Sequence, residues 1–157
     1  MNPLTGLARR LGRYESLMRL APVIIRLDRA LHKVSRGRLS LVRLAGMPSL
    51  RLVTTGRRTG LERANDLLYT PYGDDYVVIG SGWGRPTHPA WTLNLMADPN
   101  ATIIVRGRPT PVVARQVGPG PELDRIWALA LRNWPAYVME LRLANREFRI
   151  FVLSVGE

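Results

Sequence analysis

The sequence contains no cysteine, a single lysine and two histidines. Without cysteine, disulfides, thiolate nucleophiles and thiolate metal sites are all excluded. The imidazoles of His32 and His88 are too few for a multi-histidine zinc site, so we expect no metal centre. No apolar run reaches membrane-spanning length, and the N-terminus lacks the apolar stretch of a signal peptide. We therefore expect a cytoplasmic protein.

Acidic residues are also scarce, with 12 Asp and Glu against 23 Lys and Arg, which gives a net charge of +11. A charge of this size favours an anionic partner: nucleic acid, an acidic membrane surface, or a phosphorylated or carboxylated ligand. The arginines are spread along the chain and aromatic residues do not interleave with them as stacking platforms. We therefore expect no nucleic-acid partner.

The N-terminal part is predicted to be an amphipathic helix. Residues 4–33 space apolar residues by threes and fours, with arginines on the opposite face, and Pro22 is expected to kink or divide the helix. Two interpretations remain open, namely a helix packed on a core and a basic helix resting on an anionic membrane. Residues 35–48 have the composition of a connector.

Short segments rich in β-branched residues follow, and turn residues bound them. Glycines at 73 and 107 mark two hairpins, and helices are predicted near 88–97, 121–133 and 135–145. Hairpin-linked strands without regular helical crossovers indicate an antiparallel sheet, which suggests a small α+β barrel, split or closed, of about six strands with flanking helices. The strands are expected at 50–55, 64–71, 75–81, 101–107, 110–116 and 148–154. We expect one domain over residues 1–157, with residues 1–48 as an N-terminal helical extension.

A glycine-rich loop, GSGWGRPTHP at residues 80–89, lies between a predicted strand and a predicted helix. Alternating glycines allow a backbone to approach a flat or phosphorylated ligand, although a mobile surface loop has the same composition. Thr87 is expected to cap the helix, whose first N–H groups would point back at the loop. Trp91 and Asn94 should share one face of this helix. They either face a ligand in the loop, or Trp91 belongs to the core and Asn94 caps a neighbouring loop.

Arg57 and Arg58 lie between two glycines at the tip of a predicted hairpin, in the string TTGRRTG. Their forked donors suit phosphate or carboxylate, and Arg63 on the returning strand could reach the same side. A solvated turn is the alternative. Further along, WPAY at 134–137 places aromatics at a helix start, where they form either a lid over an apolar substrate or ordinary packing.

Reactive side-chain sets are missing: there is no spaced carboxylate pair, no Ser-His-Asp set and no Walker loop. If the protein is an enzyme, a bound organic cofactor should therefore carry the reaction.

TTGRRTG followed by GSGWGRPTHPAWTLNLMADPNA closely resembles the deazaflavin-dependent nitroreductases, which are split β-barrel reductases that use coenzyme F420. The resemblance is strong over residues 50–117 and extends to the WPAY segment and the closing strand. It implies an F420H2-dependent oxidoreductase that transfers a hydride from the reduced deazaflavin to an electron-poor small molecule such as a quinone, a nitro compound or an enone.

The resemblance also implies which residues act. The anionic phosphate and oligoglutamate tail of F420 would meet the arginine turn. Tyr137 and Ser81 are the implied catalytic residues, and Trp134 with Tyr137 the implied substrate-binding residues. The implied cofactor-binding residues are Arg57, Arg58, Thr59, Arg63, Ala64, Asn65, Asp66, Ile79, Gly80, Ser81, Gly82, Ala90, Trp91, Thr92, Leu93 and Asn94.

The chain departs from the family pattern at four positions. Many members have proline at the position of Asp66 and lysine at that of Gly82. Tyrosine is often found at the position of Leu68, and some members have an aromatic residue at that of Glu140. These departures bear mainly on substrate preference. Other functions stay open: a split-barrel flavoprotein that uses FMN, a non-catalytic basic nucleic-acid-binding module, or a protein that holds the deazaflavin at a membrane without turnover. Peripheral contact with the inner face of the plasma membrane through residues 4–33, and a homodimer, are left open as well.

Overall fold

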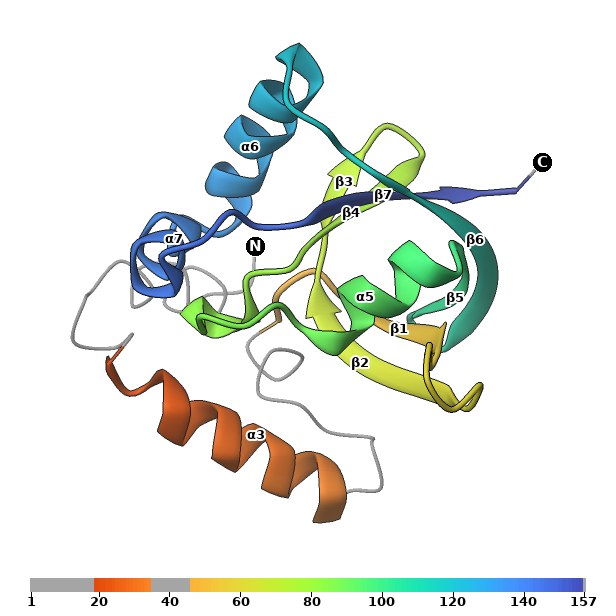
Figure 1. Ribbon diagram of the computed structural model, residues 1–157, viewed down its shortest axis with the longest axis horizontal. Coiled ribbons are helices and arrows are strands. Elements are labelled where there is room, and N and C mark those ends of the chain that lie inside the picture. The colour runs from red at the N-terminus through yellow and green to blue at the C-terminus, as the bar shows by residue number, and fades with distance from the viewer. Residues whose placement is uncertain (1–18, 35–45, 157) are drawn as a thin grey trace.

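The computed structural model describes residues 19–34 and 46–156 (Figure 1). Seven antiparallel strands in this part of the chain form one sheet in the order β2-β1-β5-β6-β7-β4-β3. The strands are β1 (Ser49–Thr55), β2 (Glu62–Leu68), β3 (Thr70–Tyr72), β4 (Asp75–Ile79), β5 (Asn100–Val105), β6 (Arg108–Gln116) and β7 (Ile150–Val155). The helices are α3 (Ala21–Val34), α5 (Ala90–Ala97), α6 (Pro121–Asn133) and α7 (Tyr137–Ala144), with a 3-10 turn, η1, at Gly82–Gly84.

The sheet curls into a split barrel and has a hydrophobic cluster on each of its two faces. Figure 1 shows α5 inside the curve of β1, β5 and β6, with α6 and α7 beside β3, β4 and β7. Alternation along β4 explains the two cores, because successive side chains point to opposite faces. Val78 packs with Trp91 of α5 and Phe151 of β7, whereas Val77 packs in a second cluster with Ile126 of α6 and Tyr137 of α7.

The strand prediction is wrong at one place. The segment expected as a single strand at 64–71 is two strands, β2 and β3, which lie at opposite edges of the sheet. β2 pairs with β1, β3 pairs with β4, and the chain changes partner at Tyr69, whose N–H donates to the carbonyl of Pro48. An apolar run carries no signal for a change of partner, so the sequence could not show this break.

A second correction concerns the start of α5. Thr87 does not cap the helix: Pro89 occupies the N-cap position and makes no side-chain capping bond, and the Thr92 hydroxyl donates to the Pro89 carbonyl at 2.7 Å. The carbonyl of Thr87 instead accepts a hydrogen bond from Arg146. The predicted extents of α6 and of the two hairpins at Gly73 and Gly107 are confirmed.

Of the predicted N-terminal helix, residues 4–18 lie outside the described residues, as do residues 35–45 of the connector. Leu20 lies in a turn, and α3 begins at Ala21 with Pro22 in its first turn, where proline is tolerated. Within residues 19–34 and 46–156, no helix combines the length and apolar composition needed to cross a bilayer.

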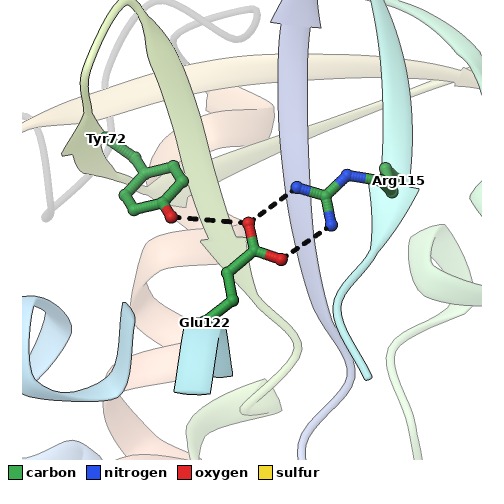
Figure 2. Close-up of polar contacts among 3 residues, drawn as sticks. All are labelled: Tyr72, Arg115 and Glu122. Atoms are coloured by element: carbon green, nitrogen blue, oxygen red, sulfur yellow. Dashed lines mark hydrogen bonds and ion pairs between the residues drawn. The ribbon is translucent and has the colours of Figure 1, made fainter. Parts of the chain in front are cut away.

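An exposed polar cluster joins β3, β6 and the start of α6 (Figure 2). Arg115 donates two hydrogen bonds to the Glu122 carboxylate, at 3.0 and 2.8 Å, and the Tyr72 hydroxyl donates a third at 3.4 Å. The hydrogen bond from Arg115 lowers the pKa of Glu122. Since Glu122 lies in the first turn of α6, its charge also suits the positive end of that helix.

We expect Glu122→Gln to lower the denaturation midpoint slightly at pH 7 and to have a smaller effect at about pH 3. A carboxyl whose pKa is lowered by folding contributes stability above its unfolded pKa, and this contribution disappears as the pH falls through the folded pKa. Urea unfolding of both proteins at the two pH values measures the difference. Molar salt should shrink the difference at pH 7, because the pair is exposed. A difference that grows in acid would contradict this account.

Candidate functional site

A groove of about 580 Å³ opens between β2, the end of β4, the glycine loop, the start of α5 and α7. Its volume lies in the range of small-molecule and cofactor sites. Three tryptophans supply flat apolar walls, and polar groups lie between them. The lining residues are Lys33, Ala64, Asn65, Asp66, Leu67, Leu68, Ile79, Ser81, Gly82, Trp83, Arg85, Pro89, Trp91, Trp134, Tyr137 and Glu140.

The glycine loop takes a backbone path that few sequences permit. Gly82, Trp83 and Gly84 all have positive φ, at 57°, 58° and 73°. This left-handed region is unusual for a bulky residue such as Trp83 and implies strain that the surroundings must offset. A Cβ at Gly84 would lie 3.1 Å from the carbonyl oxygen of Glu140, so the loop packs directly on α7.

Arg146, just beyond α7, holds this loop in place. Its guanidinium donates to the carbonyl oxygens of Gly80, Ser81, Arg85 and Thr87 at 3.0 to 3.1 Å. Arginine has five donors in a fixed fork and so can satisfy several carbonyls at once. Burial and then the charge of Arg149 lower the pKa of Arg146, although a guanidinium remains charged at any physiological pH.

His88 lies beside this arginine, with Nδ1 3.4 Å from Nη1 of Arg146. Partial burial and the charges of Arg149 and Arg146 lower the pKa of His88 below its usual value of 6.5. The imidazole is therefore neutral at pH 7.

The arginine turn is anchored to α5 through Asn94. The buried amide of Asn94 accepts from the N–H of Arg57 at 3.1 Å and donates to the Thr54 hydroxyl at 3.0 Å. The side chains of Arg57 and Arg58 are exposed. Trp91, three residues before Asn94, lines the groove, and three residues of helix rise by about 4.5 Å. The cationic turn therefore lies close to the α5 end of the groove.

The α7 wall of the groove contains two buried titratable groups. The indole Nε1 of Trp134 donates to Oε1 of Glu140 at 2.8 Å, and Ser81 also hydrogen bonds to this carboxyl. Burial raises the pKa of Glu140, although these two hydrogen bonds oppose the shift. Burial, followed by the charge of Glu140, raises the pKa of Tyr137.

The structure brings together about half of the residues expected to bind cofactor or substrate. Ala64, Asn65, Asp66, Ile79, Ser81, Gly82, Trp91, Trp134 and Tyr137 line the groove. Arg57, Arg58, Thr59 and Arg63 are exposed on the β1–β2 hairpin, while Gly80, Ala90, Thr92, Leu93 and Asn94 lie outside the lining. Gly80 packs closely against Thr92 of α5, since a Cβ on Gly80 would lie 2.8 Å from Cγ2 of Thr92.

Sequence reasoning missed several lining residues: Lys33, Leu67, Leu68, Trp83, Arg85, Pro89 and Glu140. The positions of Trp83 and Arg85 within the glycine loop were a usable signal. No local signal marks Lys33, because only the folded chain brings the end of α3 to the groove.

These residues fit a flat redox ring with an anionic tail. Trp83, Trp91 and Trp134 offer apolar walls for a ring, and the exposed arginines offer forked donors for a tail. Between these two regions, Ser81 and backbone groups of the loop offer polar contacts to a ring edge.

We expect Arg146→Lys to destabilise the protein by about 1.5–3 kcal/mol, because an ammonium cannot satisfy four spread carbonyls and at least one buried acceptor loses its bond. Arg142→Lys is the matched control: Arg142 is exposed on α7, and its change should stay within about 0.5 kcal/mol. Urea denaturation of both variants measures the effect. Equal stability of the two variants would show that Arg146 does not hold the loop.

Known proteins are similar to this chain in sequence and in fold. A sequence model of the family described as F420H(2)-dependent quinone reductase matches residues 24–154. An F420H(2)-dependent quinone reductase of Mycobacterium tuberculosis is 34% identical over 111 residues, which cover 70% of this chain and 74% of the relative.

Two solved structures agree with this likeness. One, described as an F420-H2 dependent reductase (FDR-A), superposes with a TM-score of 0.62 at 27% identity over 68% of this chain and 94% of its own. Another, described as a domain-swapped dimer, has a TM-score of 0.64 at 26% identity over 84% and 96% of the two chains. The chain belongs to the F420H2-dependent quinone reductase family and is therefore a split-barrel oxidoreductase whose cofactor is coenzyme F420.

Proposed function

We propose that the groove holds the deazaflavin ring and a quinone side by side, and that the quinone is the electron acceptor. The observation that carries this proposal is the convergence of the glycine loop, Trp91 and the Trp134–Tyr137 wall on one space beside the arginine turn. The walls are mainly apolar and aromatic, which suits the flat, weakly polar head of a quinone.

Under this proposal the cofactor lies along the glycine loop and β2. Ile79, Ser81 and Gly82 contact the ring, Ala64, Asn65 and Asp66 border its linker, and Trp91 lies against its face. Arg57, Arg58, Thr59 and Arg63 bind the phosphate and the oligoglutamate tail. When bound, the deazaflavin supplies the hydride.

The protein contributes mainly position and the exclusion of water. Holding two reactants within reach of each other can lower a barrier by up to about 7–11 kcal/mol. Trp134 and Tyr137 form the substrate side of the groove in this proposal. The Tyr137 phenol stays protonated because its pKa is raised, so it can donate a hydrogen bond to an acceptor oxygen. Ser81 offers a second donor to the oxygen on which negative charge develops.

The direct test mixes purified protein with reduced F420 and, separately, a quinone, a nitroaromatic and a conjugated enone. We expect rapid oxidation of the cofactor by the quinone, followed through recovery of the absorbance of oxidised F420. A titration with FMN serves as the cofactor control. Saturable binding of FMN without binding of F420, or oxidation by every acceptor except quinones, would refute the proposal.

Arg57→Ala and Arg58→Ala should each weaken F420 binding by about tenfold, which corresponds to about 1.4 kcal/mol. Each change removes a forked cation from the anionic tail and leaves the groove intact. Fluorescence titration with oxidised F420 measures the affinity. Arg108→Ala is the control, since Arg108 is exposed on the β5–β6 hairpin and should leave affinity unchanged. Unchanged affinity in the Arg57 and Arg58 variants would exclude the turn as the tail site.

We also propose that α3 rests on an anionic membrane, where a lipid-soluble quinone would be found. An exposed apolar stripe runs along α3 and the turn before it. It consists of Leu20, Val23, Leu27 and Val34, which are 51%, 50%, 59% and 84% exposed. These positions follow the spacing of a single helical stripe. Arg19, Arg26 and Lys33 are exposed on the same segment and suit acidic lipid headgroups.

Sedimentation with lipid vesicles tests the role of α3. We expect binding to vesicles that contain anionic lipid, and a loss of about tenfold or more in the partition coefficient for Val23→Gln with Leu27→Gln, since each apolar side chain contributes about 1.5–3 kcal/mol when buried. Val113→Gln is the control, because Val113 is a similarly exposed valine on β6. A different result would assign the stripe to a homodimer. In that case the wild type would not bind vesicles and would have a solution mass of twice 17.6 kDa, and the double variant would have the mass of a monomer.

A further inference from the structure

Glu140 is a buried carboxyl whose hydrogen-bond partners carry no positive charge. It is 2% exposed, lies one turn after Tyr137 on α7, and lines the groove. Within the described residues, its carboxyl hydrogen bonds to the Trp134 indole and the Ser81 hydroxyl, which are both neutral. A carboxyl buried among neutral partners favours the protonated form, because the low dielectric penalises the ion.

The charged groups that face the same groove do not reverse this tendency. Lys33 comes from α3, Arg85 from the glycine loop and Asp66 from β2, and all three lie on the groove lining. Asp66 is paired with Arg51 at 3.1 Å. On α7 itself, Tyr137 is neutral. The balance of burial and hydrogen bonds raises the pKa of Glu140, so the carboxyl is expected to keep its proton in the folded protein.

Reduction of a quinone requires such a proton. The acceptor takes up a hydride and then needs one proton on the oxygen that becomes negative. Tyr137 is a poor acid here because its pKa is raised above the usual value. The Ser81 hydroxyl is a poor acid alone, but it hydrogen bonds to Glu140 and lines the groove. Ser81 is thus placed between a buried acid and the space where the acceptor would lie.

We propose that Glu140 is the proton reservoir of the reaction and that Ser81 relays its proton to the acceptor oxygen. This inference rests on the proposed function. The acceptor gains a hydride, with its electron pair, from the reduced cofactor. The Ser81 O–H bond then breaks as its proton passes to the acceptor oxygen, and the Glu140 O–H bond breaks as its proton passes to Ser81. The carboxylate is reprotonated by the proton that the cofactor loses on oxidation, so two electrons and two protons move in total.

The variant Glu140→Gln distinguishes the role of Glu140 as an acid from its role in packing. Glutamine keeps the shape of the side chain, can still accept from Trp134 and can donate to Ser81, but it has no proton to transfer. We expect the single-turnover rate of quinone reduction at pH 7 to fall about 100-fold or more, with the affinity for oxidised F420 unchanged. Glu147→Gln is the control, since Glu147 is an exposed glutamate on the loop after α7 and should keep the wild-type rate.

The pH dependence gives a readout that a purely structural role would not change. The wild-type rate should fall as the pH rises through the folded pKa of Glu140, whereas the slow Glu140→Gln rate should not follow that titration. Stability should respond in the same direction. A carboxyl whose pKa is raised by folding contributes stability at low pH and loses it as the pH rises from about 4.3 through the folded pKa. Urea unfolding of the wild type relative to Glu140→Gln measures this slope without any cofactor.

Infrared spectroscopy of the cofactor-free wild type tests the proposal without any requirement that the variant fold. We expect the carbonyl stretch of a protonated carboxyl to persist at pH 7, and Glu140→Gln to remove it. Absence of this band in the wild type would overturn the proposal, as would a full single-turnover rate in Glu140→Gln. If the wild type reduces no quinone, the proposed function and this inference both fail, whereas an active wild type with an equally active variant refutes the inference alone.

Discussion

The grip of Arg146 on the glycine loop is the interaction on which the groove depends. Three consecutive residues with positive φ would not hold one conformation alone, since a bulky residue disfavours that region. Four carbonyls that converge on one guanidinium offset this strain. The loop thereby presents Ser81 and Gly82 to the groove and packs on α7. A cation is well suited to this role, because it adds donors without an acceptor of its own.

The groove combines two different electrostatic environments. At the β1–β2 hairpin, exposed arginines create a positive, solvated surface suited to an anionic tail. Along α7, Tyr137 and Glu140 are buried, and burial raises the pKa of both groups. In the proposed mechanism, binding energy comes from the hairpin end and proton transfer takes place at the α7 end. Asn94 fixes the arginine turn to α5, because its buried side chain bonds both Thr54 and Arg57.

Much of the fold could be predicted because its signals are local. Alternating β-branched segments, the hairpin glycines at 73 and 107, and Pro121 at a helix start each act over a few residues, and the elements they predicted are present. The break at Tyr69 could not be predicted, because it depends on which edges of the sheet the two strands join. Thr87 is not the helix cap, because α5 begins later than expected and Pro89 occupies the N-cap position.

The sequence by itself determined the family, the cofactor and the two motifs that frame the groove, because short strings with fixed spacing encode local backbone shape and donor type. Only the tertiary structure decided which residues meet. It showed that the buried Asn94 side chain bonds Thr54 and Arg57, and it brought Lys33 to the groove. It also buried Glu140 between Trp134 and Ser81. The burial and hydrogen bonding of Glu140 depend on contacts between residues far apart in the chain. These contacts set its pKa, and the sequence alone does not distinguish it from any other glutamate.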